Sequence, residues 1–152
     1  MWGLLAKSRL FITVLPDGVY MNRWEYTKVI EKHFAKWLRG VKKPFLVQDY
    51  ESCLWCDEPQ AALHAIGVEV SDFHPRHSPD LNAIEGVWKL LRERLEATQL
   101  AERETREQFV RRLYAARDYV NKHYRSTLRT LSRNQKVRAQ DLVDNDGHHI
   151  DW

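Results

Sequence analysis

The chain has 152 residues, of which 43% are hydrophobic and 30% are charged. This length suits one domain with a buried core, and the composition is ordinary for a globular protein. No apolar run approaches the roughly 20 residues of a membrane-spanning helix, and the N-terminus lacks the charged-then-apolar order of a signal peptide. Two cysteines are too few for a disulfide scaffold and indicate a reducing compartment.

The net charge of +3 is unevenly distributed along the chain. Residues 1–87 carry 10 basic and 11 acidic side chains (−1), residues 88–140 carry 14 and 6 (+8), and residues 141–152 carry none and 4 (−4). A basic segment of this kind attracts polyanions, most often nucleic acid. A solvated, arginine-rich helix face explains the charge equally well, and charge alone does not separate the two.

The first third of the chain predicts two strands and a helix. Apolar residues 1–5 and 10–15 predict strands around a turn at 7–9, and Pro16-Asp17-Gly18 predicts a second turn. Asn22 and Glu25 have capping-box spacing at the start of a helix that Gly40 ends. Its apolar stripe comprises Tyr26, Val29, Ile30, His33, Phe34 and Trp37. We expect His33 to be packed rather than a metal ligand, because no second ligand lies four residues away.

The next elements alternate between strand and helix. Residues 45–49 predict a buried strand that ends at Asp49, a helix follows from Pro59 to Ile66, and residues 68–73 predict another strand. The resulting order, β-β-α-β-α-β-α, favours an α/β fold with parallel strands wherever a helix crosses over. Open sheets of this class carry their chemistry at the carboxyl ends of strands, which is where Asp49 falls.

The stretch from Val70 to Leu95 predicts a strand, a proline-containing loop and an amphipathic helix. Asn82 and Glu85 again have capping-box spacing, and Glu85 lies at the border of the buried face. That face comprises Ile84, Val87, Trp88, Leu91 and Leu95, with Trp88 expected in the core rather than stacking on a base. Glu85 therefore either caps its helix or points toward the strand ends.

One motif in this stretch resembles a known family. Residues 78–88, SPDLNAIEGVW, are similar to the SPDLNPIExxW signature of mariner-superfamily (Tc-one-like) DDE transposases, with Ala83 in place of the usual proline. Residues 48–53, QDYESC, resemble the family's QDNAxxH motif, and Trp2-Gly3 resembles its WG strand. The segments 131–134 and 147–149 resemble the closing SMPxR…GGH segment more loosely.

The resemblance implies a function and a fold. It assigns Asp49 and Glu85 as the second and third catalytic carboxylates and as ligands of Mg²⁺ (or Mn²⁺). Two such cations support phosphoryl transfer, with water attacking for strand cleavage and a 3′-hydroxyl for strand joining. The implied fold is an RNase H-like mixed sheet flanked by helices, with a helical C-terminal extension. The implied partners are transposon-end DNA and full-length transposase or a second copy, without a membrane.

The chain also departs from the family pattern. The family carries its first catalytic aspartate on a central strand before the WG strand, and no such strand precedes Trp2; Asp17 lies in a turn and does not replace it. Tyr50 and Leu54 occupy the Asn and His positions of the second motif. The end-recognising helix-turn-helix region is missing as well. We therefore expect a truncated copy that is inactive alone, nuclear if eukaryotic and otherwise cytoplasmic.

We predict a partial catalytic core over residues 1–97, a basic helical extension over 98–140 and an acidic tail over 141–152. An amphipathic helix in the extension carries five candidate DNA-binding residues, namely Arg106, Arg111, Arg112, Arg117 and Lys122. A non-catalytic remnant that binds DNA or transposase is the main alternative. A small zinc module built from Cys53, Cys56, His74 and His77 is a weaker one, because the spacing departs from classical fingers.

Overall fold

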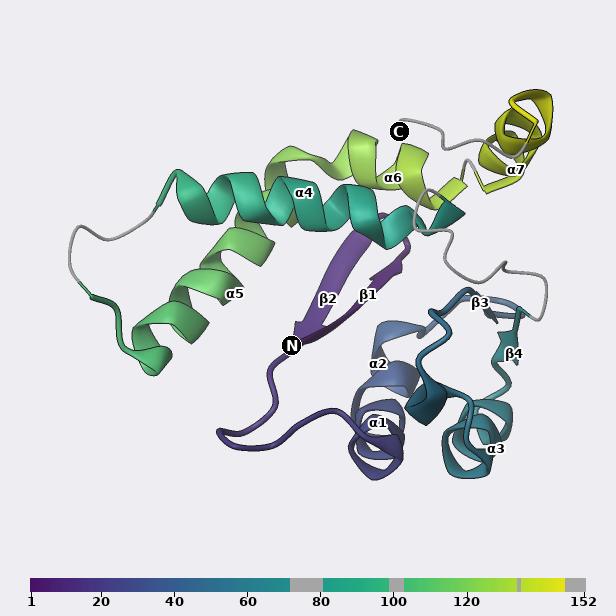
Figure 1. Ribbon diagram of the computed structural model, residues 1–152, viewed down its shortest axis with the longest axis horizontal. Helices are drawn as coiled ribbons and strands as arrows, with labels where there is room; N and C mark the ends of the chain where they lie inside the picture. The colour runs from purple at the N-terminus through teal and green to yellow at the C-terminus, as the bar shows by residue number, and fades with distance from the viewer. Residues whose placement is uncertain (72–80, 99–102, 134, 147–152) are drawn as a thin grey trace. The chain divides into compact units, whose positions relative to one another are not determined.

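The computed structural model describes residues 1–71, 81–98, 103–133 and 135–146 (Figure 1). Contacts divide the chain into two compact units, one of residues 1–14 with 83–152 and one of residues 15–82. The mixed α/β class expected from the sequence is confirmed. The described residues are mainly helical and contain two small sheets.

The first unit is built on a β-hairpin. Strand β1 (Trp2–Ala6) pairs antiparallel with β2 (Arg9–Thr13), so that Ala6 lies opposite Arg9 and Gly3 opposite Ile12. The connecting residues Lys7 and Ser8 have φ angles of 51° and 61°. Two consecutive positive φ angles define the turn type whose twist matches that of the flanking strands. Both predicted strands and the turn between them are confirmed.

Four helices complete this unit: α4 (Ala83–Glu96), α5 (Arg106–His123), α6 (Arg125–Arg133) and α7 (Gln135–Asp144). Helices α4, α5 and α6 contact the hairpin and one another (Figure 1). The shared core comprises Leu10, Ile12, Val87, Leu91, Leu113, Ala116, Val120 and Leu128, with the predicted α4 residues Ile84, Trp88 and Leu95 packed against it. Phe109 of α5 is 41% exposed, because it lies in the first turn, before the part of α5 that contacts the core.

A side chain of α5 bonds the outer edge of β2. The Asn121 side chain accepts from Leu10 N (2.7 Å) and donates to Leu10 O (2.9 Å), so these groups point away from β1. Antiparallel pairing alternates along the ladder, so the backbone groups of Gly3 and Leu5 point away from β2. Within the described residues, no further strand pairs with β1. This unpaired, uncharged edge is a template for another strand.

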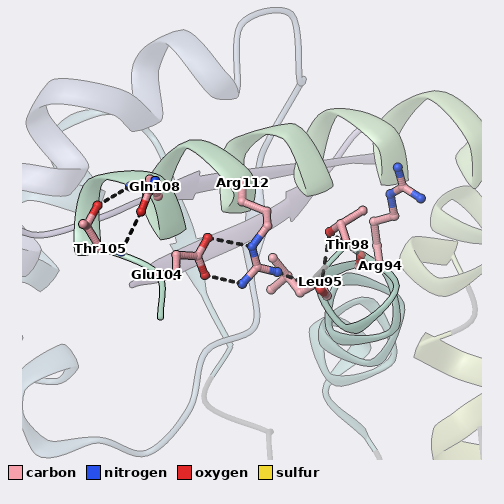
Figure 2. Close-up of polar contacts among 7 residues, drawn as sticks. All are labelled: Arg94, Leu95, Thr98, Glu104, Thr105, Gln108 and Arg112. Carbon is pink, nitrogen blue, oxygen red and sulfur yellow. Dashed lines mark hydrogen bonds and ion pairs between the residues drawn. The ribbon is translucent and has the colours of Figure 1, made fainter. Parts of the chain in front are cut away.

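A partly buried ion pair links the end of α4 to the start of α5 (Figure 2). Arg112 Nε and Nη2 donate to the two Glu104 carboxylate oxygens (2.8 and 2.6 Å), and Arg112 Nη1 donates to Leu95 O (2.7 Å). Both side chains are about one-sixth exposed, at 16% and 15%. Thr105 begins α5 with a capping box to Gln108. Side-chain contacts therefore link Leu95 of α4 to the residues that begin α5.

The ion pair predicts acid sensitivity for the first unit. Hydrogen bonding to Arg112 lowers the pKa of Glu104 below its ordinary value. A lowered folded-state pKa contributes stability that is complete above the unfolded-state pKa and is lost as the pH falls through the folded-state value. We therefore expect wild-type stability to decline below about pH 4.5 more steeply than that of Glu104→Gln, as measured by urea unfolding at several pH values. Parallel curves for the two proteins below that pH would contradict the prediction.

In the second unit, the helix that follows Asn22 packs against a shorter helix, α3 (Asp57–Ala65). The predicted helix after Asn22 is present, and the Asn22 side chain accepts from the backbone N–H groups of Trp24 and Glu25. It runs as α1 (Arg23–Val29), a π-helical stretch (Ile30–Phe34) and α2 (Ala35–Trp37), whereas the sequence predicts a uniform helix. His33 is half-buried and stacks on Trp37, and burial lowers its pKa, with Lys32 and Lys36 adding to the effect.

The sheet of the second unit is smaller than expected. Strands β3 (Phe45–Leu46) and β4 (Glu69–Val70) pair in parallel across α3 (Asp57–Ala65), as the crossover predicted. The prediction of a strand over residues 45–49 is wrong in length, because strand pairing ends at Leu46. Beyond it, the Gln48 side chain bonds Tyr26 and Leu54. The described residues thus hold two separate two-stranded sheets.

Candidate functional site

Asp49 follows a buried polar residue that anchors its segment. The Gln48 side chain is 6% exposed, accepts from the Tyr26 hydroxyl (2.9 Å) and donates to Leu54 O (3.3 Å). Gln60 donates to the same Leu54 carbonyl (2.8 Å). Burial raises the pKa of Tyr26, with the Cys53 thiol adding to the effect, so the hydroxyl stays protonated and donates. Gln48 therefore fixes the backbone from which Asp49 projects.

A tryptophan holds the same segment from the other side. Trp55 Nε1 donates to Asp49 O (2.9 Å), and the Tyr50 ring stacks on the Trp55 indole with centroids 5.0 Å apart and planes 15° apart. The Tyr50 ring therefore lies against Trp55. The short 3₁₀ turn Ser52–Leu54 closes the loop. These contacts leave the Asp49 side chain exposed.

The Asp49 carboxylate contacts a residue of the 78–88 signature. Asn82, which is 7% exposed, donates from Nδ2 to Asp49 Oδ1 over 2.7 Å. The two residues are 33 positions apart, and both belong to the second unit. One carboxylate oxygen is therefore engaged by a buried amide while the side chain remains at the surface. The sequence pattern predicts only a capping role for Asn82 and carries no signal for this contact.

Glu85 lies in the other unit. It is the third residue of α4, exposed, and three positions along the chain from Asn82. Its neighbour Gly86 faces Leu131 of α6, so the first turn of α4 is packed on the helical part of the first unit. Residues 78–80 of the signature lie outside the described residues. The structure thus brings Asp49 to Asn82 and places Glu85 at the start of the helix that follows.

The donor set around Asp49 fits a hydrated divalent cation in part. Mg²⁺ prefers carboxylate oxygens and retains several waters, and an exposed carboxylate with one oxygen oriented by an amide suits such a ligand. Within residues 1–71, 81–98, 103–133 and 135–146, no three His, Cys, Asp or Glu side chains gather as a metal site.

The cysteines are free thiols in the Asp49 loop. Cys53 Sγ donates to Glu51 (3.9 Å) and Cys56 Sγ to Ser52 O (3.4 Å). Burial and then the Glu51 charge raise the pKa of Cys53, which disfavours the thiolate that zinc requires. His74 and His77 lie outside the described residues, so the zinc module stays a hypothesis.

The five candidate DNA-binding residues on α5 differ in their surroundings. Arg106, Arg111 and Lys122 are exposed. Arg112 is engaged with Glu104, and Arg117 pairs with Asp118 (2.7 Å) beneath the Tyr114 ring. A guanidinium already paired with a carboxylate has fewer N–H donors left for a phosphate.

Together, these features define a mainly helical α/β protein whose acidic loop, Gln48 to Trp55, is fixed by buried hydrogen bonds. No protein-family model matches the chain, and no curated protein is significantly similar to it. No helix in the described part of the chain is both long and apolar enough to cross a membrane.

Proposed function

We propose that this chain is the catalytic domain of a DDE-type transposase with an RNase H-like core, in which Asp49 and Glu85 ligate Mg²⁺ or Mn²⁺. The observation that carries the proposal is the hydrogen bond from Asn82 to Asp49. It joins the two sequence motifs that resemble the family, and it does so through the acidic residue to which the resemblance assigns catalysis. Two motifs with no functional relation would not be expected to meet at that carboxylate.

The roles of the chain's own residues follow from their contacts. Asn82 orients Asp49 by occupying Oδ1, which leaves Oδ2 for a cation. Gln48 and Trp55 hold the backbone on either side of the Asp49 side chain, so the carboxylate is preorganised. Glu85, three residues beyond Asn82, supplies the second carboxylate. The bound cations stabilise charge on the transferring phosphoryl group.

A third carboxylate completes the family pattern, and β1 offers a place for the strand that carries it. The Gly3 and Leu5 backbone groups face away from β2, and a strand paired there extends the hairpin sheet. We propose that an upstream segment or a partner, such as a full-length transposase or a second copy, supplies this strand. Nicking activity then depends on the presence of that strand.

The decisive experiment is a nicking assay. The chain, extended upstream by an aspartate-bearing strand, is incubated with transposon-end DNA and Mg²⁺ or Mn²⁺. We expect nicking that falls at least 100-fold in Asp49→Ala and in Glu85→Gln, and about 10–100-fold in Asn82→Ala because that residue acts through Asp49. Glu31→Gln, at an exposed carboxylate on the π-helical stretch, serves as the matched control and retains activity. Unchanged nicking in Asp49→Ala and Glu85→Gln would refute the catalytic assignment.

A second candidate is a non-catalytic protein that binds DNA or a transposase. The observation that favours it is the basic helical segment, which carries 14 basic and 6 acidic residues over 88–140 (+8). Absence of nicking in the extended chain, together with salt-dependent DNA binding, would favour this candidate over the enzyme.

A further inference from the structure

Helix α6 carries three arginines on one face. Arg125, Arg129 and Arg133 recur every fourth residue, all are exposed, and the nine-residue helix contains no Asp or Glu. Four residues rise by about 6 Å along a helix, so the arginines form a row about 12 Å long. The exposed hydroxyl residues Ser126 and Thr130 lie beside this row. We call Arg125, Arg129 and Arg133 the α6 row.

The opposite side of α6 fixes the row to the core. Leu128 is fully buried among the residues of the first unit, and Leu131 packs against the position of Gly86 on α4. The helix backbone therefore cannot rotate away from its neighbours without exposing Leu128. A row held in this way presents its charges in a constant direction, which reduces the entropy lost on binding.

The α6 row differs electrostatically from the arginines of α5. Arg112 and Arg117 have carboxylate partners, whereas no ion pair forms between the α6 row and any acidic residue in the described ranges. Like charges four residues apart on a helix repel, and Arg125 stands in the first turn, where the helix dipole favours an acid. These features weaken the helix, so an interaction with an external anion explains them better than a stabilising role does.

We propose that the α6 row binds the phosphate backbone of duplex DNA without reading its sequence. Three guanidinium groups donate to phosphate oxygens, and Ser126 and Thr130 add neutral donors beside them. This inference rests on the proposed function for the choice of DNA as the polyanion. The main DNA contact then lies on α6, whereas the sequence pattern predicts it on α5.

The test measures binding of the full chain to a fluorescent 20-base-pair duplex by anisotropy at several KCl concentrations. The triple variant Arg125→Gln/Arg129→Gln/Arg133→Gln is compared with Arg106→Gln/Arg111→Gln/Lys122→Gln on α5, which removes the same charge. Each phosphate contact contributes about 0.9 to the slope of log K against log salt, so we expect the α6 variant to lose about 2.7 in slope. Its affinity should fall at least tenfold on two unrelated sequences, and the α5 variant should change much less.

Further measurements separate the alternatives. The α6 variant should keep or raise its melting temperature, since it removes repulsion, whereas a stabilising role predicts a decrease. The matching triple lysine variant should retain most of the salt slope and covers the case in which the glutamine variant fails to fold. Equal losses in the α5 and α6 variants, or tighter binding to phosphatidylserine vesicles than to duplex, would overturn the proposal. DNA binding through α6 without nicking would contradict only the enzymatic function, so the two failures are distinguishable.

Discussion

Replacing Gly3 with alanine is expected to lower the free energy of unfolding by about 1–3 kcal/mol, the usual range for overpacking. A Cβ atom at this position would lie 2.8 Å from Trp88 Cζ2, closer still to Cη2, and 3.3 Å from Phe11 O. The indole ring is partly buried against the core cluster, and the carbonyl is part of the β1–β2 ladder, so neither moves freely. Chemical denaturation followed by circular dichroism measures the effect.

Gly86→Ala provides a control with the opposite expected sign. Its Cβ would meet only the flexible end of Leu131, at 3.1 Å, and alanine favours a helix over glycine by about 1 kcal/mol. We expect this variant to be neutral or more stable. Combining Gly3→Ala with Trp88→Leu should restore part of the lost stability relative to Trp88→Leu alone, because the smaller side chain leaves room for Cβ. A Gly3→Ala protein as stable as wild type would show that Trp88 does not pack on β1.

The second large effect is expected at the buried pair of Tyr26 and Gln48. Gln48→Leu deprives the Tyr26 hydroxyl of its Gln48 acceptor and Leu54 O of one of its two donors. Breaking a buried polar contact from one side costs about 1–3 kcal/mol, because the remaining group stays away from water. We expect that loss in urea unfolding, together with weaker nicking activity, since Asp49 directly follows Gln48.

A double-mutant cycle isolates the contact. Tyr26→Phe alone removes the donor and should be destabilising, whereas Tyr26→Phe with Gln48→Leu should cost less than the sum of the single changes. Thr27→Val, at a half-exposed side chain one residue away that donates to Arg23 O, serves as the control and should show no coupling to Gln48→Leu. Strictly additive effects in the first pair would mean that the hydrogen bond from Tyr26 to Gln48 contributes nothing.

Local patterns anticipated much of the fold because they depend on neighbours in the chain. The period of Val87, Trp88 and Leu91 predicts the buried face of α4, and the positive φ angles of Gly40 and Gly67 follow helices that were expected to end there. The length of β3 was overestimated for a related reason. An apolar run looks the same whether it pairs in a ladder or packs beside one, so sequence does not show where Leu46 leaves the sheet.

The candidate site was only half visible in the sequence. Sequence motifs select Asp49 and Glu85. Gln48 also carries a sequence signal, because a polar residue at the end of an apolar run indicates a buried hydrogen bond. The arginines of α5 and α6 look alike in composition. Only their partners distinguish them, since Glu104 and Asp118 satisfy two arginines of α5.

The sequence by itself indicated the α/β class and the start of the helix after Asn22, and its motifs selected Asp49 and Glu85 as candidate carboxylates. These features arise from residue type and short-range spacing. The tertiary structure alone decided that Asn82 reaches Asp49, that Asn121 bonds the outer edge of β2, and that the α6 arginines form no ion pair with the acidic residues of the described ranges. Such contacts join residues 33 to 111 positions apart, and hydrogen bonds at that separation depend on packing that no local pattern records.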